Sequence, residues 1–251
     1  MKKQSRVALV TGGAVRIGRA ICEALAGDGF DVVIHCNRSV KEACTLAARI
    51  RRRGVRAWVV EQVLDDERSC VQLIRRALDE AGRLDVLVNN AAIFHKGGLA
   101  GLTGTELMEE FKVNCFAPVL LMREFARRAR RGCVVNLLDR RIAANDPECP
   151  SYSVSKKALA AFTEEMALIL APGFRVNAVA PGPILPPPGK GVAYFRDRAG
   201  RIPLARKITP GEVAAAVVTL IRMEAVTGQV LFVDGGQHLL GGMVEGRMVD
   251  G

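Results

Sequence analysis

Residues Val7–Gly18 read VALVTGGAVRIG, and this segment indicates the architecture of the chain. A short β-branched run, Val7–Val10, enters a glycine-rich turn, and apolar residues at helical spacing follow from Ile17 to Leu25. A strand that is apolar at every position is buried on both faces, which is typical of a parallel sheet covered by helices. The segment therefore predicts the first strand–turn–helix unit of an α/β protein.

Similar apolar runs recur along the chain, mostly separated by helical patterns such as Ala158 to Leu170. They are Val32–Ile34, Trp58–Val60, Val86–Val88, Val134–Leu137, Val176–Val179 and Val230–Val233. Together the runs predict a doubly wound, Rossmann-type α/β fold, with a parallel seven-stranded sheet and helices on both faces. The 251 residues suit one domain, 1–251. Pro181 to Lys190 holds five prolines and is expected to form a loop over a site.

Composition argues against several classes of protein. Apolar residues make up 49% and charged residues 25%, an ordinary globular balance. No apolar run reaches the roughly 18 residues of a membrane helix, and the apolar stretch behind the basic start is too short for a signal peptide. We therefore expect a cytoplasmic protein with no membrane partner. The seven cysteines are scattered singly without a C-x-x-C pair, so neither a disulfide framework nor a metal site is predicted.

The formal charge of +10 raises the question of a nucleic-acid partner. The arginine runs Arg51–Arg53 and Arg127–Arg131 fall late in predicted helices, where cations complement the helix dipole. Solvated helix ends account for these runs, so no nucleic-acid partner is expected. An anionic small-molecule cofactor is a second use for positive charge.

The turn from Thr11 to Gly18 predicts a phosphate site. A glycine-rich turn that opens a helix presents free backbone N–H groups and the positive end of a dipole, which suits a pyrophosphate. Gly12 permits the tight turn, and Gly18 lets the helix pack closely on the strand. Arg16 replaces the middle glycine of the dinucleotide-binding fingerprint.

The end of the second strand favours NADP(H) over NAD(H). An acidic residue about 20 positions beyond the glycines would bind the ribose 2′-hydroxyl of NAD. This chain has Asn37, Arg38 and Ser39 there instead. Arg38 and Ser39 suit a 2′-phosphate, and Arg16 is expected to reach the same group. We therefore predict NADPH as the cofactor, with two arginines converging on its 2′-phosphate.

One of the two tyrosines lies four residues before a lysine, as Tyr152 and Lys156. Positions i and i+4 share a helix face, so Lys156 is expected beside the Tyr152 hydroxyl. A phenol with a pKa near 10 is a poor proton donor at neutral pH. A neighbouring ammonium would lower the pKa of Tyr152 and make it a general acid. An incidental pair on a surface helix is the alternative.

The combined motifs resemble the short-chain dehydrogenase/reductase family over nearly the full chain. They are Thr11-Gly12 with Gly18, Asn89-Asn90-Ala91, Tyr152 with Lys156, Arg175-Val176-Asn177 before Pro181-Gly182, and Val233-Asp234-Gly235-Gly236. The resemblance implies a subunit, usually of a homotetramer, that moves hydride between NAD(P)H and a small organic substrate. It implies that Lys156 holds the nicotinamide ribose and that Asn114 supports Lys156 through a water. The cofactor contacts that we expect are Thr11, Gly12, Arg16, Ile17, Gly18, Asn37, Arg38, Ser39, Leu64, Asn90, Ala91, Lys156, Pro181 and Ile184.

Most members of that family have a serine thirteen residues before the tyrosine, where this chain has Asp139. A carboxylate is a poor partner for a developing alkoxide because like charges repel. It suits a C=N bond, whose nitrogen must gain a proton and whose neighbouring N–H groups need an acceptor. The alternative is a drifted loop aspartate, with the serine's role lost or moved to Ser151 or Ser153.

Within the family, the chain resembles the pteridine reductases and the related bacterial dihydromonapterin and dihydrofolate reductases. The resemblance rests on the Thr-Gly-x-x-x-Arg-x-Gly turn, the Asn-Arg-Ser segment, Asp139 and Phe94. It implies that Phe94 stacks on a flat pterin ring. The leading hypothesis is therefore an NADPH-dependent reductase of a pterin or similar planar N-heterocycle, with Asp139, Tyr152, Lys156 and Asn114 as catalytic residues.

The chain departs from the family pattern at several positions. Val63 replaces the aspartate that contacts adenine, which leaves backbone contact from Leu64, and no hydroxyl residue follows Pro181-Gly182. Ala92 and Ile93 replace small polar residues of the pteridine reductases. These departures leave the cofactor affinity and the identity of the pterin open.

Two other functions remain as alternatives. One is a 3-oxoacyl-carrier-protein reductase or general carbonyl reductase, whose basic surface could dock an acidic carrier. The other is a non-catalytic NADP-sensing protein, against which Tyr152 and Lys156 argue. Candidate surfaces for a homotetramer are the apolar helix Ala158 to Leu170, the helix around Glu110 to Phe125, and the tail from Gln237 to Gly251.

Overall fold

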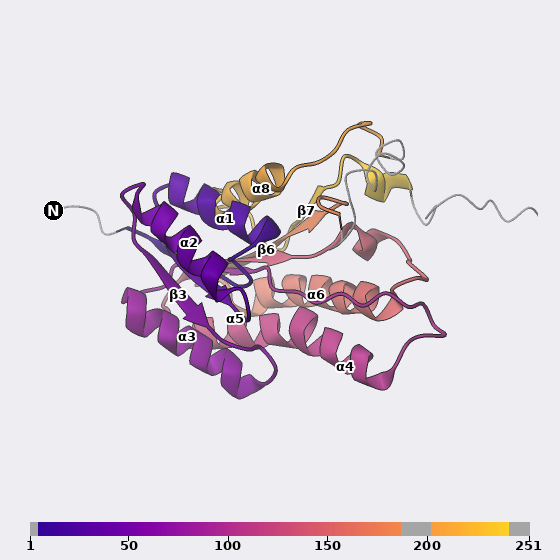
Figure 1. Ribbon diagram of the computed structural model, residues 1–251, viewed down its shortest axis with the longest axis horizontal. Coiled ribbons are helices and arrows are strands. Elements are labelled where there is room, and N and C mark those ends of the chain that lie inside the picture. The colour runs from indigo at the N-terminus through magenta and orange to yellow at the C-terminus, as the bar shows by residue number, and fades with distance from the viewer. Residues whose placement is uncertain (1–4, 187–201, 241–251) are drawn as a thin grey trace, which may run out of the picture.

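The apolar runs form a parallel sheet in the computed structural model, which describes residues 5–186 and 202–240 (Figure 1). Over these residues the sheet has seven strands in the order β3-β2-β1-β4-β5-β6-β7, and every neighbouring pair is parallel. The strands are β1 Val7–Val10, β2 Asp31–Cys36, β3 Ala57–Glu61, β4 Val86–Asn89, β5 Gly132–Leu137, β6 Phe174–Pro181 and β7 Val230–Val233. Each of the seven expected runs lies in one of these strands, so the predicted fold class is confirmed.

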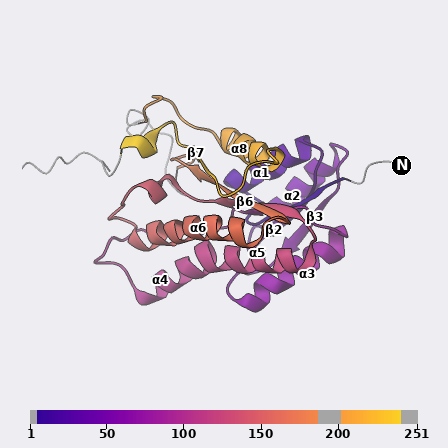
Figure 2. The ribbon, with the colours of Figure 1, turned by 180° about the vertical axis from the view of Figure 1, so that it is seen from behind.

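Helices cover both faces of the sheet. They are α1 Arg16–Gly27, α2 Val40–Arg51, α3 Glu67–Ala81, α4 Gly104–Phe111, α5 Ala117–Arg128, α6 Pro150–Ile169 and α8 Pro210–Arg222, with a π-helical turn η1 Lys112–Phe116 and 3₁₀ turns η2 Arg140–Ala143 and η3 Gln237–Leu240. Helices α1, α2 and α8 lie on one face and α3 to α6 on the other (Figures 1 and 2).

Alternation along β1 shows why the strands are apolar throughout. Ala8 and Val10 belong to the core under α1, α2 and α8, whereas Val7 and Leu9 belong to the core under α3 and α5. All four side chains are fully buried, as expected for a strand between two helical layers. The edge strand β7 differs, because Leu231 is exposed there.

The strand order places a crevice at the carboxyl ends of β1 and β4. From β1 the chain builds β2 and β3 on one side and then returns to place β4 on the other, which makes this the switch point of the sheet. Thr11 and Asn90 directly follow these two strands, and Asp139 lies two residues beyond β5 on the same edge. The predicted site residues are therefore brought together by the topology.

Other expectations have mixed outcomes. Pro181 pairs with Val233 as the last residue of β6, so the proline-rich loop begins one residue later than predicted. Residues 187–190 of that loop and residues 241–251 of the tail lie outside the described residues. The cysteines are all free, and all but Cys44 are buried. In the described ranges, no helix has the length and apolarity to cross a membrane, and no His, Cys, Asp and Glu side chains gather as a metal site would need.

Candidate active site

The glycine-rich turn has no room for side chains at its two key positions. Gly12 has φ +60°, a left-handed conformation that glycine adopts readily. A Cβ at Gly18 would lie 2.1 Å from the Gly12 carbonyl oxygen and 2.6 Å from Asn90 Nδ2. Asn90 Nδ2 donates to the Thr11 and Gly12 carbonyls at 2.8 and 3.0 Å, and Thr11 Oγ1 accepts from the Asn90 and Ala91 amides. The ends of β1 and β4 are thus bonded together beneath the turn.

The N-terminus of α1 is left open for an anion. Its N-cap residue, Val15, makes no side-chain capping bond, and the first turn contains no acidic residue. Helices α3, α4 and α8 each have a complete capping box, formed by Asp66, Thr103 and Thr209 with their partners. The free N–H groups and dipole of α1 therefore face the groove without a competing carboxylate, which fits a pyrophosphate.

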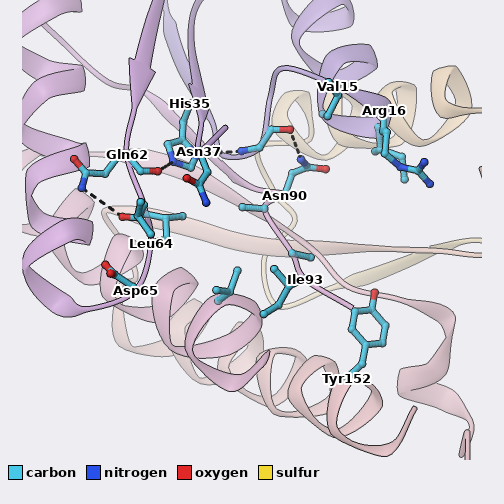
Figure 3. A pocket seen from close by; sticks show the side chains of 17 residues that line it. Val15, Arg16, His35, Asn37, Gln62, Leu64, Asp65, Asn90, Ile93 and Tyr152 are labelled. Atoms are coloured by element: carbon cyan, nitrogen blue, oxygen red, sulfur yellow. Dashed lines mark hydrogen bonds between the residues drawn. The ribbon is translucent and has the colours of Figure 1, made fainter. Parts of the chain in front are cut away.

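A groove of about 500 Å³ runs across this turn (Figure 3). Among the predicted cofactor residues, it is lined by Gly12, Arg16, Ile17, Gly18, Asn37, Leu64, Asn90 and Ala91. Arg38 and Ser39 follow Asn37 directly, and Arg38 is exposed. The groove ends at Tyr152 (Figure 3). Its size and lining fit a dinucleotide whose phosphates lie at the start of α1.

Sequence reasoning missed His35, a buried side chain of β2 that joins two walls of the groove. Its Nδ1 accepts from the Gly12 amide at 3.1 Å, and its Nε2 pairs with the Gln62 carbonyl at 2.9 Å (Figure 3). Burial lowers the pKa of His35 from 6.5 to about 4, so the imidazole is neutral near pH 7. The available signal was a histidine that directly follows the apolar run Val32–Ile34. Val63 and Asp65 also line the groove, beside Leu64.

Arg16 contacts the segment after β6, and its convergence with Arg38 on the 2′-phosphate stays a prediction. Its Nη2 donates to the Pro186 carbonyl at 3.1 Å and lies 3.5 Å from the Leu185 carbonyl. In Figure 3, Arg16 and Asn37 lie on different sides of Asn90. The Arg16 backbone has φ +53°, the conformation that the missing glycine would adopt readily. This backbone directs the side chain toward the segment after β6.

A second pocket of about 460 Å³ adjoins the groove at Arg16, Ile17, Ala92 and Tyr152. Its other lining residues are Phe94, Leu138, Asp139, Arg140, Arg141, Pro181, Gly182, Pro183, Ile184 and Leu185. Pro181 and Ile184, which we expected at the cofactor, thus lie in this second pocket. Because Tyr152 belongs to both cavities, a molecule in one would meet a molecule in the other at the phenol.

Asp139 points into the second pocket and contacts Tyr152. The Tyr152 hydroxyl donates to Asp139 Oδ2 at 3.3 Å. Arg141 donates to the same carboxylate through its backbone amide at 2.9 Å and through Nη1 at 3.1 and 3.2 Å. The Nε atom of Arg141 donates to Asp146 at 2.5 Å. The guanidinium therefore holds Asp139 in place beside the phenol.

The pKa of Tyr152 differs from the prediction. Burial raises it well above 10, the adjacent Asp139 carboxylate raises it further, and Arg141 opposes the shift. Lys156 is buried in the next turn of α6, and its Nζ lies 5.9 Å from the Tyr152 ring centroid and donates to the Leu137 carbonyl at 2.8 Å. The expectation that Lys156 lowers the Tyr152 pKa is therefore wrong. The phenol keeps its proton near neutral pH and is a donor.

The pKa of Lys156 is lowered from 10.5 to about 8, chiefly because burial disfavours the ammonium. Asn114 lies in the π-helical turn and bonds to Ile93 and to Ser155 Oγ. Its expected support of Lys156 through a water stays a prediction. A π-helical turn inside a longer helix is frequent at functional sites.

Phe94 forms one wall of the second pocket. Its ring meets the Tyr152 ring edge-on, with centroids 4.8 Å apart, and it is 45% exposed. The ring is therefore available to a flat ligand. Ser151 Oγ donates to Glu110, and Ser153 Oγ is buried without a partner among the described residues. Neither serine is among the residues that line the second pocket.

Comparison with protein families and curated proteins places this site in context. A family model described as enoyl-(acyl carrier protein) reductase matches residues 13–238. The granaticin polyketide synthase putative ketoacyl reductase 2 of Streptomyces violaceoruber is 38% identical, over 94% of this chain and 98% of its own length. The uncharacterized oxidoreductase YhdF of Bacillus subtilis (strain 168) is 33% identical, over 95% and 85% respectively.

Solved structures include two close matches. The FolM alternative dihydrofolate reductase 1 of Brucella canis, complexed with NADP, superposes with a TM-score of 0.90 at 37% identity, over 97% of each chain. The protein of the same name from Brucella suis, also in complex with NADP, gives a TM-score of 0.86 at 38% identity, over 93% of this chain and 95% of that one.

Proposed function

The chain belongs to the short-chain dehydrogenase/reductase family of oxidoreductases, and on that basis we propose that it is an NADPH-dependent reductase of a pterin or a similar planar N-heterocycle. The single observation that carries the proposal is the hydrogen bond from Tyr152 to Asp139 in the pocket that Phe94 lines. The two Brucella FolM structures, with similar sequences and bound NADP, support it.

The groove supports NADP(H) as the cofactor. Gly12 and Gly18 admit a close backbone approach, the open end of α1 suits the pyrophosphate, and Arg38 is exposed at the adenosine end for a 2′-phosphate. When bound, the reduced nicotinamide supplies the hydride. The buried Lys156 lies at the Tyr152 end of the groove and would hold the nicotinamide ribose there.

Asp139 and Tyr152 supply the proton chemistry. Reduction of C=N adds hydride to the carbon and a proton to the nitrogen. The Tyr152 phenol is protonated near neutral pH and donates that proton, while the Asp139 carboxylate accepts a hydrogen bond from a neighbouring N–H group. At a ketone the same carboxylate would face a developing alkoxide, which it repels. The arrangement therefore favours a nitrogen heterocycle.

Turnover assays test the proposal. We expect the purified protein to oxidise NADPH with dihydrobiopterin, dihydromonapterin or dihydrofolate. The Asp139→Asn variant, which keeps the side-chain shape without the charge, should lower kcat on the order of tenfold or more, because a hydrogen bond to a charged group is worth about 1.5–3 kcal/mol. Lack of turnover of any pterin by the wild-type protein would refute the proposal.

A carbonyl reductase is the second candidate, favoured by the similarity to the Streptomyces putative ketoacyl reductase. The variant Asp139→Ser separates the two candidates. If the rest of the site is built for ketones, restoring the serine should raise ketone reduction. A non-catalytic NADP-sensing role predicts that NADPH binds normally and that Tyr152→Phe changes no assay.

We also propose that the protein is a cytoplasmic homotetramer. The outer side of α6 exposes Phe162, Leu168 and Ile169, which supports burial against another subunit. The free cysteines support a reducing compartment. Light scattering at micromolar concentration should give four subunits, and a monomer would contradict the proposal.

A further inference from the structure

Two side chains bind the loop segment that carries Phe94. Glu110, near the end of α4, is fully buried, and its Oε1 accepts from the His95 amide at 2.6 Å. Asn114 Oδ1 accepts from the Ile93 amide at 2.9 Å, and its Nδ2 donates to the Ile93 carbonyl at 2.9 Å. The residues on both sides of Phe94 are therefore fixed by backbone hydrogen bonds.

The same two side chains bind α6, which lies beside α4 (Figures 1 and 2). Ser151 Oγ donates to Glu110 Oε2, and Asn114 Nδ2 lies 3.3 Å from Ser155 Oγ. Ser151 directly precedes Tyr152. Glu110 thus links His95, which follows Phe94, to Ser151, which precedes Tyr152.

We propose that Glu110 is a positioning residue, which sets the Phe94 ring at its distance from Tyr152 and thereby fixes the substrate ring over the proton donor. The statement that this ring belongs to a substrate rests on the proposed function. Because Phe94 is 45% exposed, packing alone does not determine its place. The segment from 90 to 97 has no helix or strand, so hydrogen bonds to other segments hold it, including those of Glu110 and Asn114.

Glu110 is the buried residue of α4, although a glutamate is rarely fully buried unless it is paired. Burying a carboxyl group is unfavourable unless its oxygens are hydrogen-bonded, and both oxygens of Glu110 are used on the two segments of the site. Within the family the serine–tyrosine–lysine motif does not involve this position. The contacts of Glu110 therefore point to positioning.

Three variants test the role of Glu110. In Glu110→Ala, which loses the hydrogen bonds from His95 and Ser151, KM for the pterin should rise and kcat fall, together on the order of tenfold or more in kcat/KM. KM for NADPH should stay within about twofold, because Glu110 does not line the groove. Glu110→Gln keeps an oxygen for the His95 amide and should restore most of the activity. The matched control Glu109→Ala, exposed on the same helix, should behave as wild type.

Backbone amide exchange gives a readout that does not depend on the substrate. In Glu110→Ala, exchange at residues 93–98 should accelerate while the turn at 11–18 keeps its protection. If Glu110→Ala does not fold, Ser151→Ala can be used instead. It removes only the hydrogen bond between Glu110 and α6 and should give a smaller change in the same direction. Equal effects on the KM values for pterin and NADPH, or unchanged exchange at 93–98, would overturn the inference. If the wild type reduces no pterin, the proposed function fails, and the exchange experiment still decides whether Glu110 holds the segment that carries Phe94.

Discussion

His35 predicts that the protein loses stability in mild acid and that one substitution removes the part of that loss that comes from this imidazole. The buried imidazole accepts from the Gly12 amide at 3.1 Å and pairs with the Gln62 carbonyl at 2.9 Å. These partners require the neutral Nε2–H form, because Nδ1 faces a donor and Nε2 an acceptor. Protonation of Nδ1 would break the bond to Gly12.

The size of the effect follows from the pKa values. Burial lowers the pKa of His35 from 6.5 to about 4, so between these values the unfolded chain binds more protons than the folded one. The contribution is fully present above pH 6.5 and is lost as the pH falls to about 4. At about 1.36 kcal/mol for each pKa unit, the whole loss is about 3 kcal/mol, and roughly 2 kcal/mol of it has occurred by about pH 5.

Equilibrium urea unfolding of wild type and His35→Asn, at one protein concentration, measures this loss. Asparagine keeps an acceptor for the Gly12 amide and does not titrate. Between about pH 7.5 and pH 5, the free energy of unfolding of the wild type should fall by about 2 kcal/mol more than that of the variant, since all other titratable groups are present in both proteins. If the free energy of unfolding falls by the same amount in both proteins, His35 is not a buried neutral imidazole and the reasoning is refuted.

Three further predictions concern the groove and the proton donor. Gly18→Ala should destabilise the fold by about 1–3 kcal/mol and weaken NADPH binding in a fluorescence titration, because its Cβ would clash with the Gly12 carbonyl. Gly27→Ala in the same helix meets nothing within 4 Å and should be neutral, so equal effects would contradict this account. Arg38→Ala should raise Kd for NADPH roughly 10- to 100-fold and leave that for NADH unchanged, as expected for a lost phosphate contact worth about 1.5–3 kcal/mol. The kcat for reduction should fall above about pH 8, where Lys156 loses the proton that it carries at lower pH, and a flat profile through that range would exclude a need for the ammonium.

Local patterns predicted most of the fold. A run such as Val7–Val10 is apolar at every position because its alternate side chains meet two different cores, and this can be read without knowing any partner. The places of Gly12, Gly18 and the Tyr152–Lys156 pair were equally readable, since each depends on a turn or on one helical repeat. Asp139 was found from its spacing to Tyr152.

What local patterns did not predict concerns contacts between distant segments. Arg16 was expected at the 2′-phosphate, but its guanidinium bonds to Leu185 and Pro186, about 170 residues away. The pKa of Tyr152 was expected to fall because its sequence neighbour Lys156 is cationic. Burial and Asp139 dominate instead, and burial cannot be read from a helical repeat.

Hydrophobic periodicity and glycine placement determined the sheet, the order of its elements and the turn beneath the phosphates, because these depend on the preferences of neighbouring residues. Tertiary structure alone decided the charge states and directions of the side chains at the site. His35 is neutral because β2 is covered on both faces, and Glu110 reaches both His95 and Ser151 because α4 packs beside α6. Solvation and electrostatic contact depend on which distant segments enclose a group, and only the folded chain brings those segments together.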